Sequence, residues 1–130
     1  MIAKARLKYL GVSAQKTRLV VDQVRGKNVG EALSILRFSP KRVARDVEKL
    51  LRSALANAQQ QDAKVDVDRL VVRSVYVDDA PPLKRSRHRS MGRLYRILKR
   101  SCHVSIDLDL NAKAKTTAPA QKSARPAARR

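Results

Sequence analysis

The chain has 130 residues and a formal net charge of +19, from 30 Lys and Arg against 11 Asp and Glu, so a polyanion such as nucleic acid is the expected partner. Only Tyr9, Phe38, Tyr76 and Tyr95 are aromatic, which argues against a protein that stacks successive bases on aromatic platforms and favours recognition by phosphate contacts and shape. The single Cys102 excludes an internal disulfide and suits a reducing compartment, and no apolar run approaches the roughly 20 residues of a membrane span.

Residues 2–9 alternate apolar and basic side chains, which predicts a β-strand with a basic outer surface. The apolar face comprises Ala3, Ala5, Leu7 and Tyr9, and the basic face comprises Lys4, Arg6 and Lys8.

Two helices are predicted next. Ser13 is placed to cap a helix from Ala14 to about Arg25 with its hydroxyl, and Gly26 suits the end of that helix. A shorter helix is expected over about residues 29–37, and Ser39-Pro40 predicts the start of a third. This third helix has the longest apolar stripe in the chain: Val43, Val47, Leu50, Leu51, Ala54 and Ala58.

The second half of the chain contains two β-patterned runs around a basic segment. Residues 59–68 are expected to form a loop, residues 70–77 a strand, and residues 101–110 a return strand that alternates apolar and polar side chains. Between the strands, Lys84–Arg100 contains eight Lys or Arg and no acid. A long hairpin arm is the simplest interpretation, and such a ribbon is at best marginally stable without a partner.

The predicted fold class is therefore α+β. A small three-stranded antiparallel sheet is packed by three helices and extended by a β-hairpin arm at about residues 78–103. We expect one domain over residues 1–110 and a flexible basic tail, disordered in isolation, over residues 111–130.

The sequence offers little for catalysis. Asp78, Asp79, Asp107 and Asp109 could in principle gather around Mg²⁺, but solvated acids at strand ends are the favoured interpretation, since adjacent strand residues point to opposite faces. Cys102 and His103 lack a second pair of zinc ligands, with Cys102 expected in the core and His103 outside. We therefore expect no enzyme, no cofactor, no metal and no small-molecule substrate.

The basic residues predict phosphate binding instead. Arginine dominates the arm, and its planar guanidinium suits bidentate phosphate contacts better than the lysine ammonium. Gln15, Lys16 and Arg18 follow the expected cap at Ser13, near a helix N-terminus, where anions are favoured.

Several segments resemble one known family in order and spacing. They are SAQKTRLVVDQVRGKNVGEALSIL (residues 13–36), SALANAQQQ (53–61), VYVDDAPPLKR (75–85) and GRLYRILKRSCHVSIDL (92–108). Together they are similar to the large-subunit ribosomal protein numbered twenty-two in bacteria, over nearly the whole chain up to about Leu110.

The resemblance implies a structural, rRNA-binding protein of the large ribosomal subunit that supports subunit assembly. Its globular domain would lie near the mouth of the peptide exit tunnel, with the hairpin tip lining the tunnel beside neighbouring ribosomal proteins and the nascent peptide. The expected rRNA-binding residues are Lys4, Arg6, Lys8, Ser13, Gln15, Lys16, Arg18, Lys84, Arg85, Arg93, Arg96, Lys99, Arg100 and His103.

The expected tunnel-facing tip comprises Arg87, His88, Arg89, Ser90 and Met91. Relatives usually carry an apolar residue, a proline and a lysine where this chain has Ser86, His88 and Met91. The location implied is the cytoplasmic ribosome, with a plastid ribosome also open.

The alternative is a basic architectural protein that wraps duplex DNA. Such proteins usually insert an apolar or proline wedge at the tip of an arm. The tip here is Arg87-His88-Arg89-Ser90, and Met91 is a poor substitute for that wedge.

Overall fold

Three strands form one antiparallel sheet in the order β1-β3-β2. The structure, a computed structural model, describes residues 2–61 and 66–110. Strand β1 spans Ala3–Leu10, β2 spans Leu70–His88 and β3 spans Leu94–Leu110. Because β3 lies between the other two, the last strand of the chain pairs with both β1 and β2.

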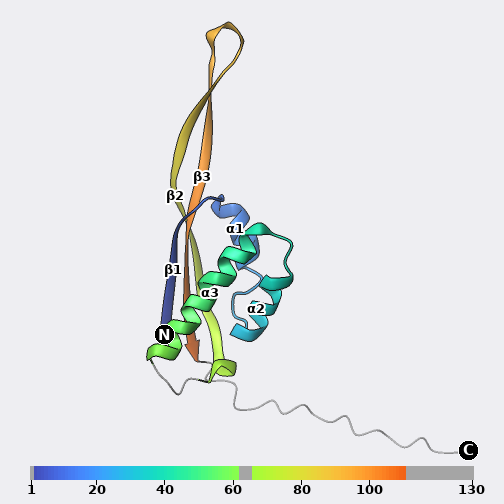
Figure 1. Ribbon diagram of the computed structural model, residues 1–130, viewed down its shortest axis with the longest axis vertical. Coiled ribbons are helices and arrows are strands. Elements are labelled where there is room, and N and C mark those ends of the chain that lie inside the picture. The colour runs from blue at the N-terminus through green and yellow to red at the C-terminus, as the bar shows by residue number, and fades with distance from the viewer. Residues whose placement is uncertain (1, 62–65, 111–130) are drawn as a thin grey trace, which may run out of the picture.

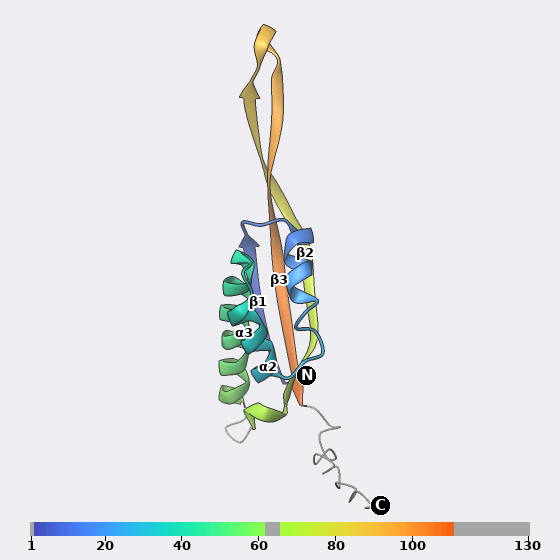
Figure 2. The same ribbon diagram turned by 90° about the vertical axis from the view of Figure 1, so that its right-hand side faces the viewer.

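Three helices cover one face of this sheet (Figures 1 and 2). They are α1 (Ala14–Val21), α2 (Val29–Phe38) and α3 (Arg42–Gln61). Every residue of the predicted apolar stripe on α3 is buried, against a sheet face that includes Val104, Ile106 and Leu108. The predicted α+β class is confirmed, because one sheet face supplies the core and the helices close it.

The helix ends and caps differ from the prediction at three places. Helix α1 ends at Val21, and turns carry the chain to Gly26, whose φ of +76° ends the helical path as expected. The Ser13 hydroxyl makes no capping hydrogen bond; its backbone carbonyl instead accepts from Thr17. Ser39 is the C-cap of α2, and α3 begins only at Arg42, so Pro40 is not a helical residue.

Helix α3 also continues through residues that were expected to form a loop. It includes Gln59, Gln60 and Gln61, and a short 3₁₀ helix then spans Val67–Arg69. Glutamine is a good helix former, so a polar run that buries nothing can still extend an established helix. The predicted tail, residues 111–130, lies outside the described residues, so its disorder stays a prediction.

Two strand predictions require correction. Tyr9 is not in the core: a register shift between Leu7 and Leu10 interrupts β1, and Tyr9 has a φ of +57° and is 66% exposed. In β3, Ser105 and Asp107 are buried although they belong to the expected polar face. As a central strand, β3 has neighbours on both edges, and their side chains cover it.

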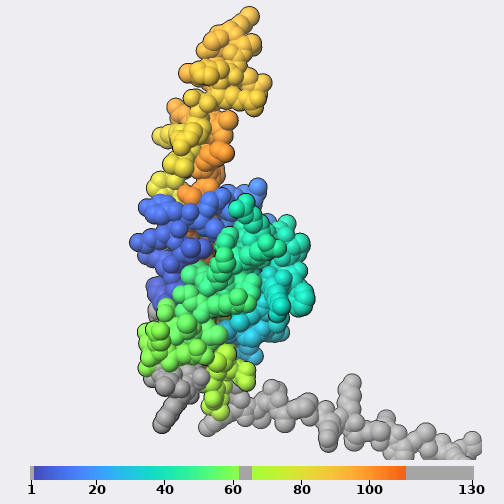
Figure 3. All heavy atoms as spheres, in the orientation of Figure 1, coloured from blue at the N-terminus to red at the C-terminus, as the bar shows by residue number. Residues whose placement is uncertain are grey.

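The hairpin arm is formed by the outer halves of β2 and β3, which project beyond the helices as a narrow column (Figures 1 and 3). Pairing is regular from Leu83↔Lys99 to His88↔Leu94. A register shift between Ala80 and Leu83 contains Pro81 and Pro82, and prolines cannot donate to a strand ladder. This irregular segment separates the arm from the domain.

The outer edge of β2 is covered by the α1 region. Arg18 donates to the carbonyl of Val77 at 2.9 Å, and Arg25 donates to that of Val75 at 3.0 Å. The amide of Gly26 donates to Val72 at 2.9 Å. These contacts occupy carbonyl groups that an edge strand would otherwise leave exposed.

Candidate nucleic-acid interface

The arm consists of exposed cations without acidic partners. No acid occurs in residues 80–106, and every residue from Leu83 to Arg100 is exposed. Within residues 2–61 and 66–110, the ion pairs all involve other basic residues: Lys4, Arg25, Lys27, Arg52, Arg69 and Arg73. The positive charge of the arm is therefore available to an external anion, which is what phosphate binding requires.

Each face of the arm alternates charge with apolar surface. Cross-strand partners lie on the same face of a ribbon, and four of the six pairs join a cation to an apolar side chain. These pairs are Leu83↔Lys99, Lys84↔Leu98, Arg85↔Ile97 and Arg87↔Tyr95. The cations of such a surface can contact phosphates while the apolar side chains beside them contact sugars or bases. It therefore suits folded RNA better than a polymer that offers negative charge alone.

The turn of the arm lies slightly beyond the predicted tip. Ser86, Arg87 and His88 still belong to the paired strand, and the chain reverses over Arg89–Arg93. The amide of Arg89 donates to the carbonyl of Arg93 at 2.9 Å, while Met91 and Gly92 adopt left-handed conformations. Met91 is 92% exposed, and the guanidinium of Arg89 lies 5.2 Å from the ring centre of Tyr95. The turn therefore presents one apolar side chain among cations.

At the base of the arm the structure brings together residues that are far apart in sequence. A cleft of about 890 Å³ is lined by residues of the β1–α1 connection and of both strands at the base of the arm. Its polar lining includes Ser13 and Lys16 from the α1 region and Lys99 and Arg100 from β3, all predicted nucleic-acid contacts. The rest of its lining is Tyr9, Gly11, Val12, Pro81, Leu83, Leu98 and Ser101, with no acid. We call it the base cleft.

His103 contacts Tyr9, near the end of β1, beside the base cleft. Its Nδ1 accepts a hydrogen bond from the Tyr9 amide at 3.0 Å, and the two rings meet edge to face with centroids 4.6 Å apart. Since Nδ1 is an acceptor, the ring hydrogen lies on Nε2. His103 was predicted to bind nucleic acid directly; in this structure it also holds the strained Tyr9 backbone.

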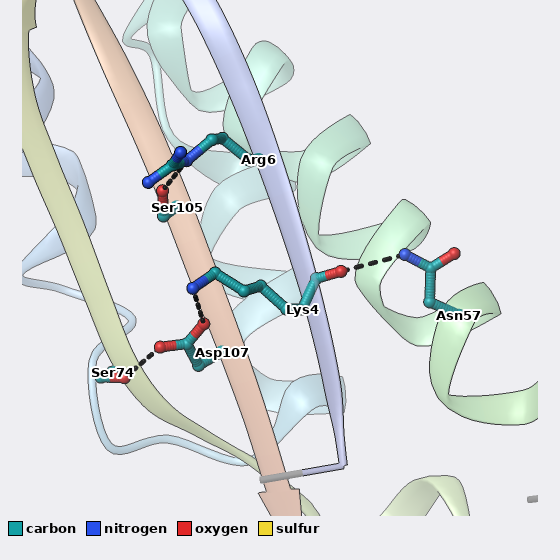
Figure 4. A network of polar contacts seen from close by, with 6 residues as sticks. All are labelled: Lys4, Arg6, Asn57, Ser74, Ser105 and Asp107. Atoms are coloured by element: carbon teal, nitrogen blue, oxygen red, sulfur yellow. Dashed lines mark hydrogen bonds and ion pairs between the residues drawn. The ribbon is translucent and has the colours of Figure 1, made fainter. Parts of the chain in front are cut away.

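On the open face of the sheet, two predicted contacts are partly engaged within the protein (Figure 4). Arg6 Nε donates to Ser105 Oγ at 3.0 Å, and Lys4 Nζ lies 3.7 Å from Asp107 Oδ1. Asp107 Oδ2 also accepts from the Ser74 hydroxyl at 2.9 Å. Lys8 is exposed, whereas Lys4 and Arg6 give part of their bonding capacity to β3, so this face offers less uncompensated positive charge than the arm.

The predicted contact residues on α1 also differ in whether they are engaged within the protein. Gln15 and Lys16 are exposed, while Arg18 uses one guanidinium nitrogen to hold the edge of β2. An arginine has five N–H donors, so Arg18 can hold β2 and still contact an anion.

The structure does not gather the four candidate carboxylates at one place. Asp78 and Asp79 pair with His103 and Cys102, whereas Asp107 and Asp109 lie farther along β3, opposite Ser74 and Val71. In residues 2–61 and 66–110, no three metal-binding side chains converge. Nor does any helix there combine the length and hydropathy that a membrane span requires.

Sequence reasoning missed the apolar half of the base cleft. Tyr9 was assigned to the apolar face of the first strand, and neither Leu83 nor Leu98 was predicted to be a contact residue. One signal was present: Tyr9 and Leu10 are adjacent apolar residues, so strict alternation fails there. The contribution of Pro81 had no sequence signal, because it depends on where β2 leaves the domain.

Comparison with known proteins agrees with this geometry. The family model described as "Ribosomal protein L22p/L17e" matches residues 5–109. The chain is 54% identical over 108 residues to "Large ribosomal subunit protein uL22" of Geobacter sulfurreducens, covering 83% of this chain and 96% of that protein. The protein of the same name in Syntrophotalea carbinolica is 52% identical over 109 residues, with coverages of 84% and 98%.

A third relative of the same name, in Solibacter usitatus, is 49% identical over 106 residues, covering 82% of this chain and 94% of its own length. The matched residues include the three helices, the whole arm and all of the three strands except Ala3, Lys4 and Leu110.

Proposed function

The chain belongs to the ribosomal protein L22p/L17e family, and from that premise we propose how it acts as a structural constituent of the large ribosomal subunit. Its partners are rRNA and other ribosomal proteins, and its role is structural, not enzymatic. The named relatives are bacterial, so it acts in the cytoplasmic ribosome. The DNA-binding alternative is not favoured.

The arm is the part of the protein that most needs RNA. It is a two-stranded ribbon outside the core, and its like charges repel one another in the free protein. Phosphates on either side would neutralise that charge and hold the ribbon straight. The observation that carries the proposal is the acid-free stretch of residues 80–106, exposed over the whole of the arm beyond Leu83.

The arm divides into a shaft and a tip. The shaft cations contact rRNA phosphates, and they are Lys84, Arg85, Arg93, Arg96, Lys99 and Arg100. The tip, Arg87–Met91, reaches the wall of the exit tunnel and meets the nascent peptide there. The exposed Met91 among cations suits contact with chains of varied sequence, because its flexible thioether adapts to different side chains.

An arm-shortened protein tests the division of labour between the globular domain and the arm. Lys84 and Leu98 are cross-strand partners, so residues 85–97 can be replaced by Asn-Gly, which forms a two-residue hairpin turn. The globular core is untouched, and we expect the same unfolding temperature and continued co-sedimentation with large subunits in high salt. Ribosomes carrying the shortened protein should lose the nascent-chain cross-links that the full-length protein forms.

Three results would contradict the proposal. The shortened protein could fail to fold, it could fail to enter ribosomes, or the cross-links could persist without the tip. Preferential retention of the full-length protein on bulk DNA, and not on large subunits, would instead support the architectural alternative.

A further inference from the structure

We propose that the base cleft receives one unstacked nucleotide of the bound RNA, with its base against Tyr9 and its flanking phosphates on Lys16, Lys99 and Arg100. This inference rests on the proposed function, because it assumes that RNA is the partner of this surface. Recognition of this RNA was expected to rely on phosphate contacts and shape, and the inference adds one contact to a base.

The lining of the cleft has two parts that a single nucleotide would satisfy together. Three cations and no acid select an anionic partner. The apolar part, which includes the exposed Leu83 and Leu98, gains nothing from a phosphate and needs a flat apolar group beside it. A nucleotide displaced from its stack offers an aromatic base and two adjacent phosphates, and proteins commonly receive such bases on aromatic side chains.

The size of the cleft is consistent with this occupant. Its volume of about 890 Å³ lies within the range of roughly 300–1,000 Å³ that is usual for small-ligand sites. An acidic peptide would also match the cations, but it would leave the exposed Tyr9 ring and the leucines without a flat partner.

The backbone of Tyr9 provides an independent observation. A bulky non-glycine residue with a φ of +57° is uncommon, and such conformations persist only when neighbouring contacts maintain them. Here the amide of Tyr9 donates to His103 Nδ1, and the His103 ring contacts the tyrosine edge to face. The result is an aromatic ring turned out of the core, 66% exposed, on the wall of a cationic cleft.

Ultraviolet cross-linking of the full-length protein to deproteinised bacterial large-subunit RNA tests the inference. Digestion with trypsin releases Tyr9–Lys16 as one peptide, and we expect mass spectrometry to find a nucleotide adduct on its tyrosine. Tyr9→Leu should abolish this adduct and weaken RNA binding about tenfold, the order expected for one stacked base. Tyr9→Phe should restore both, and Lys16→Gln should weaken binding by about threefold.

Matched controls use residues outside the cleft. Phe38→Leu removes an exposed aromatic ring, and Lys41→Gln removes an exposed lysine, so both should bind RNA as the wild type does. Thermal melting checks that Tyr9→Leu folds; if it does not, Lys16→Gln on the exposed face of α1 still decides the question.

Unchanged RNA affinity in Tyr9→Leu and Lys16→Gln, or adducts confined to the arm, would overturn the inference while leaving the proposed function intact. A wild-type protein that bound no large-subunit RNA would instead overturn the proposed function, and the inference with it.

Discussion

At the scale of single residues, four left-handed conformations within residues 2–61 and 66–110 mark places where the chain changes direction. Gly26 and Gly92 have φ values of +76° and +67°, and Tyr9 and Met91 have values of +57° and +59°. Gly26 ends the α1 region inside the domain, whereas Gly92 lies in the turn of the arm, far from the core. Both glycines thus supply a positive φ, but one lies within the folded domain and the other lies in an arm outside the core.

This difference predicts unequal effects of the same substitution. Gly26→Ala should lower the free energy of unfolding by about 1–2 kcal/mol, because a Cβ is disfavoured at positive φ. Gly92→Ala introduces similar strain, but the arm contributes little to the cooperative core, so its effect should stay below about 0.5 kcal/mol. Urea unfolding followed by circular dichroism measures both, and equal losses would mean that the arm unfolds together with the domain.

At the scale of secondary-structure elements, the central position of β3 leaves two edges of the sheet to be protected, and side chains from α3 and from the α1 region protect them. Within the domain, β3 pairs with a strand on each side, so β1 and β2 are the edges. On β1, Asn57 of α3 donates to the carbonyl of Lys4 at 3.0 Å. On β2, Arg18 and Arg25 donate to carbonyl groups, and both edges are thereby blunted against strand addition.

The arginine contacts predict a structural cost. The double substitution Arg18→Met and Arg25→Met keeps the apolar stems but removes both donors, and it should lower the free energy of unfolding by about 1–3 kcal/mol. Arg42→Met with Arg45→Met, on the exposed side of α3, is the matched control and should cost less than about 0.5 kcal/mol. Thermal unfolding of the free proteins compares the pairs, and equal stabilities would show that water replaces the arginines at no cost.

At the scale of the whole molecule, folding and binding use separate parts of the chain. The core lies between the sheet and the helices, whereas the largest uncompensated charge lies on an arm that buries almost nothing. A free protein of this kind is stable in its domain and unsupported in its arm, so most of the electrostatic binding energy is expected from the arm.

Salt dependence should reveal that separation. Replacing residues 85–97 by Asn-Gly removes Arg85, Arg87, Arg89, Arg93 and Arg96. Three of these, Arg85, Arg93 and Arg96, belong to the phosphate-binding shaft, and each neutralised phosphate contributes about 0.7–0.9 to the slope of log K against log salt concentration. The slope should therefore fall by about 2–3 in magnitude. Filter binding to large-subunit RNA over a series of KCl concentrations gives the slope, and an unchanged value would place the phosphate contacts on the domain.

The periodicity of the sequence predicted the α+β class, the three helices, the three strands and the apolar stripe on α3. These features repeat over many residues, and burial of one face enforces them. Helix ends, the bulge at Tyr9 and the burial of Asp107 were not predicted. The bulge and the buried carboxylate depend on contacts with segments distant in sequence: His103 for Tyr9, and Lys4 and Ser74 for Asp107.

The sequence by itself determined the partner class, because 30 basic residues and an acid-free run of residues 80–106 carry their charge in any conformation. Only the tertiary structure decided which cations act together. Lys16 and Lys99 are far apart along the chain, and they line one cleft because β3 occupies the centre of the sheet and α1 packs at the base of the arm. Charge is a property of composition, whereas a binding site is a property of packing.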